Sequence, residues 1–175
     1  EFKFFFDYFD FEETQDDLAE LIQTEFHGLI CDHSDIRKHI NEHPVELAYT
    51  LSLVHTGDAF SITPPWVLHH FPLVEQVLKQ LCGTPCHRPC SYCGEKLDIH
   101  KNLQSVFGYK EFRTFDGEPM QERAVQAAVD GKSLLTIFPT GGGKSLTFQL
   151  PAIMAGRNEH GLTVVISPLQ SLMKD

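Results

Sequence analysis

The stretch Leu134–Leu150 reads LLTIFPTGGGKSLTFQL, and the order of its features predicts the fold around it. An apolar run at 134–138 predicts a strand, and three consecutive glycines at 141–143 predict a tight loop. Lys144 and Ser145 then open a segment with helical spacing. This order favours binding of a nucleotide's phosphates, because glycines let backbone N–H groups face the ligand and the helix N-terminus is positively polarised. Lys144 would contact the β- and γ-phosphates, and Ser145 would bind Mg²⁺.

The glycine loop departs from the strict phosphate-loop pattern G-x-x-x-x-G-K-S/T. Phe138 occupies the position where that pattern has its first glycine. The sequence Pro139-Thr140 followed by G-G-G-K-S resembles the form P-T-G-x-G-K-S of superfamily 2 helicases rather than the form found in kinases or small GTPases. The alternative interpretation is a glycine-rich turn before a helix, with no ligand.

Length and composition are those of an ordinary globular chain. The 175 residues suffice for one large or two small domains, and 42% are apolar while 22% are charged. No apolar run approaches the ~20 residues that cross a bilayer, so the sequence predicts no membrane partner. The chain starts at Glu1 without a methionine and stops at Asp175 just after a strand-like segment, which leads us to expect a fragment of a longer protein.

Negative charge is concentrated in the first third of the chain. Residues 1–60 hold 14 acidic against 3 basic side chains, a net of −11, whereas residues 61–175 have a net of +1. An acidic surface repels phosphate backbones, so residues 1–60 are poor candidates for contacting nucleic acid.

The spacing of apolar residues predicts a helical region before the cysteines. Helices are expected at 14–27 and 73–81, after Ser34, and from Pro44 until Gly57 ends the helix. A further helix is expected after Thr63, which can cap it. We therefore predict an acidic helical connector region at 1–81.

Four of the five cysteines are clustered and predict a metal site. Cys82, Cys86, Cys90 and Cys93 have spacing that can converge on one tetrahedral Zn²⁺, whereas Cys31 stands alone. A nucleotide-binding chain suggests a reducing compartment, where a metal site is favoured over disulfides. We predict a zinc-knuckle-like loop at 82–100 with structural Zn²⁺. The open alternatives are an iron–sulfur cluster, a radical-SAM triplet of the last three cysteines, thiols without metal, and a histidine (His87 or His100) in place of one thiolate.

The remainder predicts an α/β fold. A helix should end at Gly108, another should begin near Pro119 and stop at Gly131, and the helix after the glycine loop should reach about Ala155. The segment 156–161 reads as a turn, and the apolar run at 162–167 predicts a buried parallel strand. Strand, helix and strand in this order favour the start of a doubly wound parallel sheet.

Three segments in this part resemble, in order, motifs 0, I and Ia of the RecQ family of superfamily 2 DNA helicases. They are FGYKEFR (Phe107–Arg113) with Gln121, FPTGGGKS (Phe138–Ser145) and VVISPLQSLMKD (Val164–Asp175). The spacing of 23 residues from Gln121 to Lys144 fits the family. One departure is the seven residues between Arg113 and Gln121, where the family usually has two.

The resemblance implies that residues 101–175 are the N-terminal part of a RecA-like ATP-binding domain. It also implies roles for single residues. Tyr109, Arg113 and Gln121 would hold the adenine; Thr140, Gly141, Gly142, Gly143, Lys144 and Ser145 would hold the phosphates and Mg²⁺; and Ser167 and Lys174 would lie along a DNA strand.

The activity implied by the resemblance is ATP-dependent unwinding of single-stranded or forked DNA in the 3′ to 5′ direction, in a bacterial cytoplasm. The 175 residues contain no D-E-x-H segment, so we expect negligible ATPase activity from them alone. Residues 1–100 occupy the position of the connector in bacterial RecQ-like proteins with an upstream nuclease-like domain. Two other classes stay open: a P-loop kinase or transporter-type ATPase, and a zinc-binding interaction module attached to another P-loop NTPase.

Overall fold

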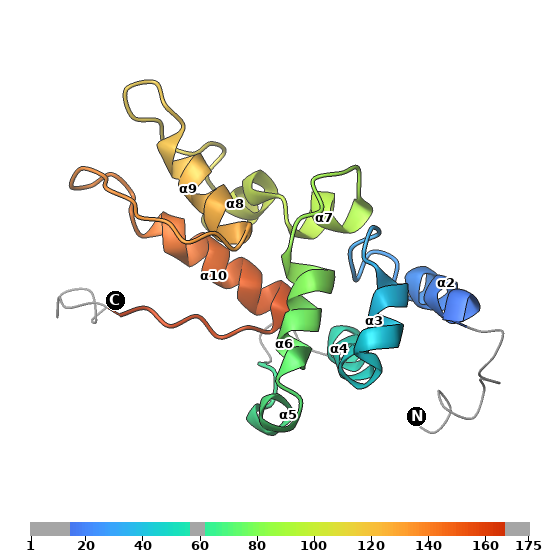
Figure 1. The fold of residues 1–175 in the computed structure, drawn as a ribbon. Helices are drawn as coiled ribbons and strands as arrows, with labels where there is room; N and C mark the ends of the chain where they lie inside the picture. Colours follow the sequence, from blue (N-terminus) through green and yellow to red (C-terminus); the bar gives the residue numbers. More distant parts are fainter. Residues whose placement is uncertain (1–14, 57–61, 167–175) are drawn as a thin grey trace.

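The structure is a computed structural model that describes residues 15–56 and 62–166, and the described part is mainly helical (Figure 1). Its elements are α2 (Gln15–Glu25), α3 (Ile36–Glu42), α4 (Pro44–Thr56), α5 (Pro65–His70), α6 (Leu73–Leu78), the π-helix η1 (Lys79–Gly83), α7 (Ser91–Lys96), α8 (Ile99–Phe107), α9 (Met120–Val129) and α10 (Leu146–Glu159).

The helices before residue 98 surround one apolar core. Here α3 packs on α2, α4 packs on α6, and η1 continues α6 directly. Val77, Leu78 and Leu81 are almost fully buried in the centre of this core. The predicted helical region is confirmed in the described residues, and α4 begins at Pro44 as expected because proline has no N–H to leave unpaired at a first turn.

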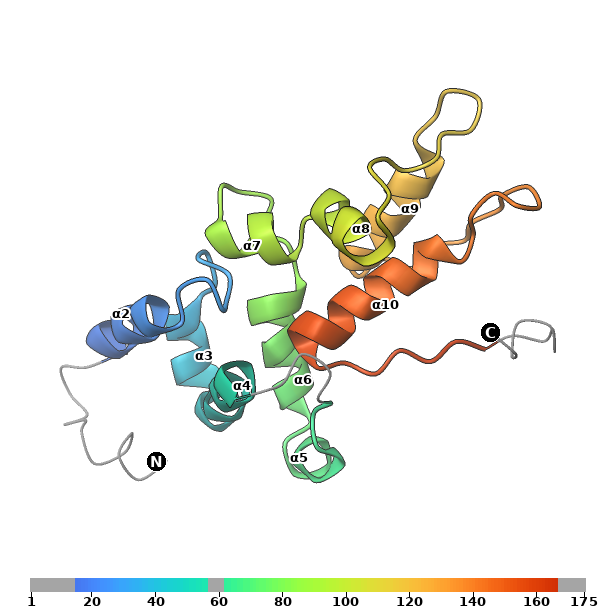
Figure 2. The same ribbon diagram turned by 180° about the vertical axis from the view of Figure 1, so that it is seen from behind.

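A second core joins α8, α9 and α10. Leu103, Val125 and Leu150 have no exposed surface, and α9 lies along α10 in both views (Figures 1 and 2). Gly108 ends α8 with a positive φ of 72°, a conformation that glycine adopts without strain. The end of α10 also contacts η1, so the two cores are adjacent.

The two predicted strands are not formed within the described residues. Residues 134–138 and 162–166 carry no strand assignment, and Leu135, Ile137 and Ile166 are 89%, 84% and 91% exposed. A strand is defined by backbone hydrogen bonds to a neighbouring strand, and the part of the chain that the structure describes supplies no neighbour for either segment. The α/β expectation is therefore not met in this part, which is mainly helical.

Two smaller predictions are also wrong. The segment 156–159 is not a turn but the last part of α10, which ends at His160 with a φ of 50°. Thr63 does not cap α5; its backbone N–H instead donates to the carbonyl oxygen of His160 at 3.2 Å. No helix in the described ranges is both long and apolar enough to cross a membrane.

Candidate nucleotide-binding site and cysteine cluster

The glycine loop leads into α10, and its backbone geometry requires glycine at three positions. Gly141 and Gly143 have φ angles of +76° and +72°, which side chains with a Cβ rarely adopt. A Cβ on Gly142 would lie 2.9 Å from the carbonyl oxygen of Pro139, and one on Gly143 would lie 2.6 Å from Nε2 of Gln121. The run of glycines is therefore explained by the conformation of the loop.

The loop presents unpaired donors at the start of α10. Within the described part of the chain, the backbone N–H groups of Gly143, Lys144 and Ser145 donate no hydrogen bond. The side chains of Lys144 and Ser145 are exposed, and the first turn of α10 contains no acidic residue. Free N–H groups at the N-terminus of a 14-residue helix, beside a lysine, form a site suited to an anion such as a phosphate.

Gln121, at the start of α9, connects this loop to the segment before α9. Its side chain is buried, with Oε1 accepting from the backbone N–H of Arg113 at 2.8 Å and Nε2 donating to the carbonyl of Gly143 at 3.0 Å. The guanidinium of Arg113 donates to the carbonyl of Gly141 at 2.7 Å. Two predicted adenine-binding residues thus hold the glycine loop in place.

The seven residues between Arg113 and Gln121 form a small turn that brings Gln121 back to Arg113. Phe115 and Glu118 exchange two backbone hydrogen bonds of 2.9 Å, with Asp116 and Gly117 at positive φ between them. The loop before α9 and the glycine loop project from the same end of the α9–α10 pair in both views (Figures 1 and 2). The longer spacing is absorbed locally, and Arg113 remains beside the site.

Other predicted residues are less closely tied to the loop. Thr140 is exposed at its start, and Tyr109 is 58% exposed and stacks on Phe107, with ring centroids 6.2 Å apart. In the described part of the chain, no hydrogen bond or ring contact joins Tyr109 to Gln121 or Arg113. Ser167 and Lys174, the predicted DNA contacts, lie outside the described residues.

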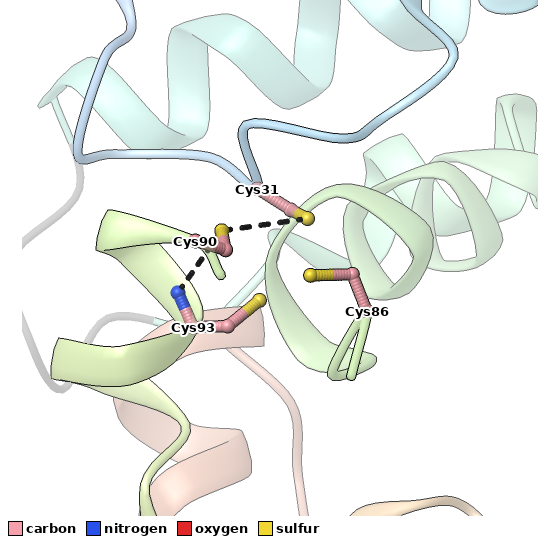
Figure 3. Close-up of side chains that lie close together, drawn as sticks. All are labelled: Cys31, Cys86, Cys90 and Cys93. Atoms are coloured by element: carbon pink, nitrogen blue, oxygen red, sulfur yellow. Dashed lines mark hydrogen bonds between the residues drawn. The ribbon is translucent and has the colours of Figure 1, made fainter. Parts of the chain in front are cut away.

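The structure brings four thiols together, but the set differs from the predicted one. Sγ atoms of Cys31, Cys86, Cys90 and Cys93 all lie within 4.8 Å of one another (Figure 3). Cys82 is excluded because it lies on η1, where its buried thiol points to the carbonyl oxygen of Leu29 at 3.7 Å. The prediction of Cys82 was therefore wrong.

Cys31 was missed because it is distant in sequence from the other three cysteines. It lies in the turn between α2 and α3, and its backbone N–H donates to the carbonyl of Leu81 at 2.8 Å. The only sequence signal is the count: five cysteines for a site of four. Neither suggested histidine joins the cluster, since His87 faces Asp130 and His100 faces Glu122.

Contacts around the thiols fix the two segments to each other. Backbone N–H groups of Asp32 and Cys93 both donate to Sγ of Cys90 at 3.4 Å. The Asp32 carboxylate accepts from the backbone N–H of Ser91 at 2.7 Å and from its hydroxyl at 2.9 Å. Burial raises the pKa of the Cys31 thiol to about 11, so a cation is needed to favour its thiolate at neutral pH.

Comparison with known proteins defines the class of the C-terminal part. The DEAD/DEAH box helicase family matches residues 118–175, which include the glycine loop, so this part is similar to the start of a helicase domain of that family. The chain is similar to the ATP-dependent helicase SGS1 of Saccharomyces cerevisiae, with 49% identity over 45% of this chain. It is also similar to the ATP-dependent DNA helicase RecQ of Haemophilus influenzae, with 49% identity over 42% of this chain. The human ATP-dependent DNA helicase Q4 is 50% identical over 45% of this chain.

Over about 45% of its length, the chain is homologous to RecQ-family ATP-dependent DNA helicases. The chain covers only 5%, 10% and 6% of the lengths of those three relatives. No solved structure matches it. The four clustered thiols all lie outside the residues that the helicase family matches.

Proposed function

We propose that these residues contribute the ATP site of a RecQ-type DNA helicase, which moves 3′ to 5′ along DNA at the expense of ATP. In this proposal, residues 101–175 are the N-terminal part of a RecA-like domain. The observation that carries it is the pair of hydrogen bonds by which Gln121 joins the segment before α9 to a glycine loop with free N–H groups. The similarity to RecQ-family helicases supports the same conclusion.

The phosphates of ATP would occupy the start of α10. Backbone N–H groups at 143–145 would donate to phosphate oxygens, and the Lys144 ammonium would neutralise their charge. The Ser145 hydroxyl would hold Mg²⁺, which when bound offsets negative charge on the β- and γ-phosphates. Thr140 and the flanking glycines at 141–142 would shape the loop around them.

Adenine would be held on the other side of Gln121. Tyr109 offers an exposed aromatic ring for stacking, and the exposed guanidinium of Arg113 offers donors for the edge of the base. Gln121 is buried and its amide bonds to Arg113 and Gly143, so it would meet the base by exchanging one of these contacts, which would couple base binding to loop position.

The remaining parts of the chain complete the proposal. Residues 1–81 form the acidic connector and 82–100 the cysteine-rich loop, with an upstream nuclease-like domain as a candidate neighbour. Ser167 and Lys174 would contact the phosphates of single-stranded or forked DNA. Repair, recombination and defence against foreign DNA are the processes that such an activity would serve, in the cytoplasm.

The test is a substitution of Lys144 in the protein that carries these residues. Lys144→Ala should lower DNA-stimulated ATP hydrolysis by about 100-fold or more, because removing a single group that stabilises transition-state charge has effects of this size. Unwinding of a forked DNA with a 3′ single-stranded tail should be lost in parallel. Lys101→Ala is the matched control, since Lys101 lies on α8 and pairs with Glu95 at the surface.

Two results would refute the assignment. ATP hydrolysis that is unaffected by DNA would favour the rival class, a zinc-binding interaction module on another P-loop NTPase. Robust ATP turnover by residues 1–175 alone, abolished by Lys144→Ala, would contradict the view that the site needs further residues. Binding of a fluorescent ATP analogue to residues 1–175 separates loss of binding from loss of hydrolysis.

A further inference from the structure

The four clustered thiols come from two segments more than 50 residues apart. Cys31 lies between α2 and α3, Cys86 and Cys90 lie in the loop before α7, and Cys93 lies on α7 itself (Figure 3). The four sulfur atoms lie close together. We propose that Cys31, Cys86, Cys90 and Cys93 bind one structural Zn²⁺ that ties the turn after α2 to the loop before α7.

The distances between the sulfur atoms fit a single tetrahedral ion. Zn–S bonds of about 2.3 Å place the sulfurs of a tetrahedron about 3.8 Å apart. Sγ of Cys90 and Sγ of Cys31 are already 3.9 Å apart, and the whole group lies within 4.8 Å. Small rotations of the side chains therefore close the site. An iron–sulfur cluster would hold its thiolates farther apart, because several irons lie between them.

Hydrogen bonds to Cys90 identify its sulfur as an acceptor. Two backbone N–H groups, from Asp32 and Cys93, donate to the same Sγ at 3.4 Å. Donors that converge on a sulfur orient it within the site. One donor comes from each of the two segments, so these contacts fix the relative position of the ligands.

The polar groups beside the four thiols are paired with one another. Asp32 accepts from both the N–H and the hydroxyl of Ser91, and His33 Nε2 lies 2.9 Å from the carbonyl of Pro89. Because Asp32 is fully engaged in this way, it acts as a positioning residue for Cys31 and not as a ligand. Four thiolates then close the coordination and leave no open position for catalysis.

The local fold explains why a metal is needed here. The loop at 84–90 contains no helix or strand, and α3 and α7 have only 7 and 6 residues. Helices of this length gain little stability by themselves, and an ion that joins distant segments supplies folding free energy. The zinc thus orders the loop at 84–90 and the short helices α3 and α7 beside it. These elements belong to the part of the chain that includes η1, and η1 contacts α10.

The experiment compares Cys31 with Cys82, the cysteine that sequence spacing favours as the fourth ligand. In the 175-residue chain, metal analysis should find one zinc per molecule and no visible absorption from iron–thiolate bonds. Cys31→Ser should lose the zinc or release it at least tenfold faster to a chelating dye. Cys82→Ser, the matched control, should keep one zinc, because the Cys82 thiol faces Leu29 and not the cluster.

Loss of zinc in Cys31→Ser could also result from unfolding. A second variant, Cys31→His, therefore replaces the thiol with another metal ligand. Cys31→His should keep one metal, and its Co²⁺-substituted form should show a weaker sulfur-to-metal charge-transfer band than the wild type, because one of four thiolates is gone. Zinc loss in Cys82→Ser with retention in Cys31→Ser would overturn the ligand set. Absence of metal, or iron in its place, would overturn the zinc. Binding of the ATP analogue is a separate measurement, so failure here leaves the helicase proposal untouched.

Discussion

Alanine at Gly143 should destabilise the fold much more than alanine at Gly141. Both residues have a positive φ, of +72° and +76°, so each substitution incurs the same backbone strain. Their surroundings differ, since a Cβ on Gly141 meets no atom within 4 Å, whereas one on Gly143 meets Gln121 Nε2 at 2.6 Å. The pair therefore separates the cost of backbone strain from the cost of losing the contact with Gln121.

The expected magnitudes follow from these geometries. Placing a residue with a Cβ in the left-handed region costs about 1–2 kcal/mol. At Gly143, the added Cβ also displaces a buried amide that bridges two backbone groups, and leaving such a group unsatisfied costs about 1–3 kcal/mol more. Gln121 cannot simply swing aside, because doing so would break its bond to Arg113 as well. We expect Gly143→Ala to exceed Gly141→Ala by about 1–3 kcal/mol.

Urea unfolding followed by circular dichroism measures this difference, and titration with a fluorescent ATP analogue measures its effect on the site. Gly28→Ala provides a third comparison, because Gly28 has a φ of +76° with open space around it and lies between α2 and α3, outside the nucleotide site. It should lower stability about as much as Gly141→Ala and leave nucleotide affinity unchanged. Equal destabilisation by the Gly141 and Gly143 variants would show that the hydrogen bonds of Gln121 to Arg113 and Gly143 do not stabilise the loop.

Four further outcomes are expected. Leu103→Ala should cost about 2–5 kcal/mol of unfolding free energy, because Leu103 is fully buried, whereas Leu135→Ala at an 89% exposed position should stay within about 0.5 kcal/mol. Burial raises the pKa of the Glu159 carboxyl. The folded state is therefore favoured while this carboxyl is protonated, and that stability is lost as the pH rises from about 4 through the raised pKa. Glu159→Gln should remove this loss, as measured by unfolding midpoints at several pH values. If Glu159→Gln leaves the pH profile unchanged, the side chain is not buried. Asp32→Ala should weaken zinc binding by about 10- to 100-fold in a chelator competition, and unchanged affinity would mean that Asp32 does not position Cys31.

Helix ends were predictable from sequence because their signals are local. Pro44 begins α4, and Gly108 ends α8 with the expected left-handed conformation. These residues act through their own φ preferences, so neighbours in sequence are enough to place them. The glycine loop was predictable for the same reason, because its three glycines and Lys144 are consecutive in the sequence.

Strands and the fourth thiol were not predictable because both depend on distant partners. The apolar run at 134–138 has the composition of a buried strand, yet strand formation needs a neighbouring backbone that the described residues do not provide. Cys82 has the better spacing, but the π-helix η1 directs its thiol into the core. Cys31 joins the cluster because its backbone bonds to Leu81, a contact that no spacing rule encodes.

The cysteine-bearing part and the nucleotide loop are linked through α10. This helix has 14 residues and so is about 21 Å long, with the glycine loop at its N-terminus. At its other end it packs against η1, where a Cβ on Gly83 would overlap the Glu159 side chain, and Asn158 donates to the carbonyl of Lys96 at 3.3 Å. If the four thiols bind zinc as proposed, the ion would order the loop that precedes Lys96 and so would also support the surface on which α10 ends. If the chain were a zinc-binding interaction module attached to another P-loop NTPase, its two parts could fold independently. The shared packing at the end of α10 instead makes them one structural unit.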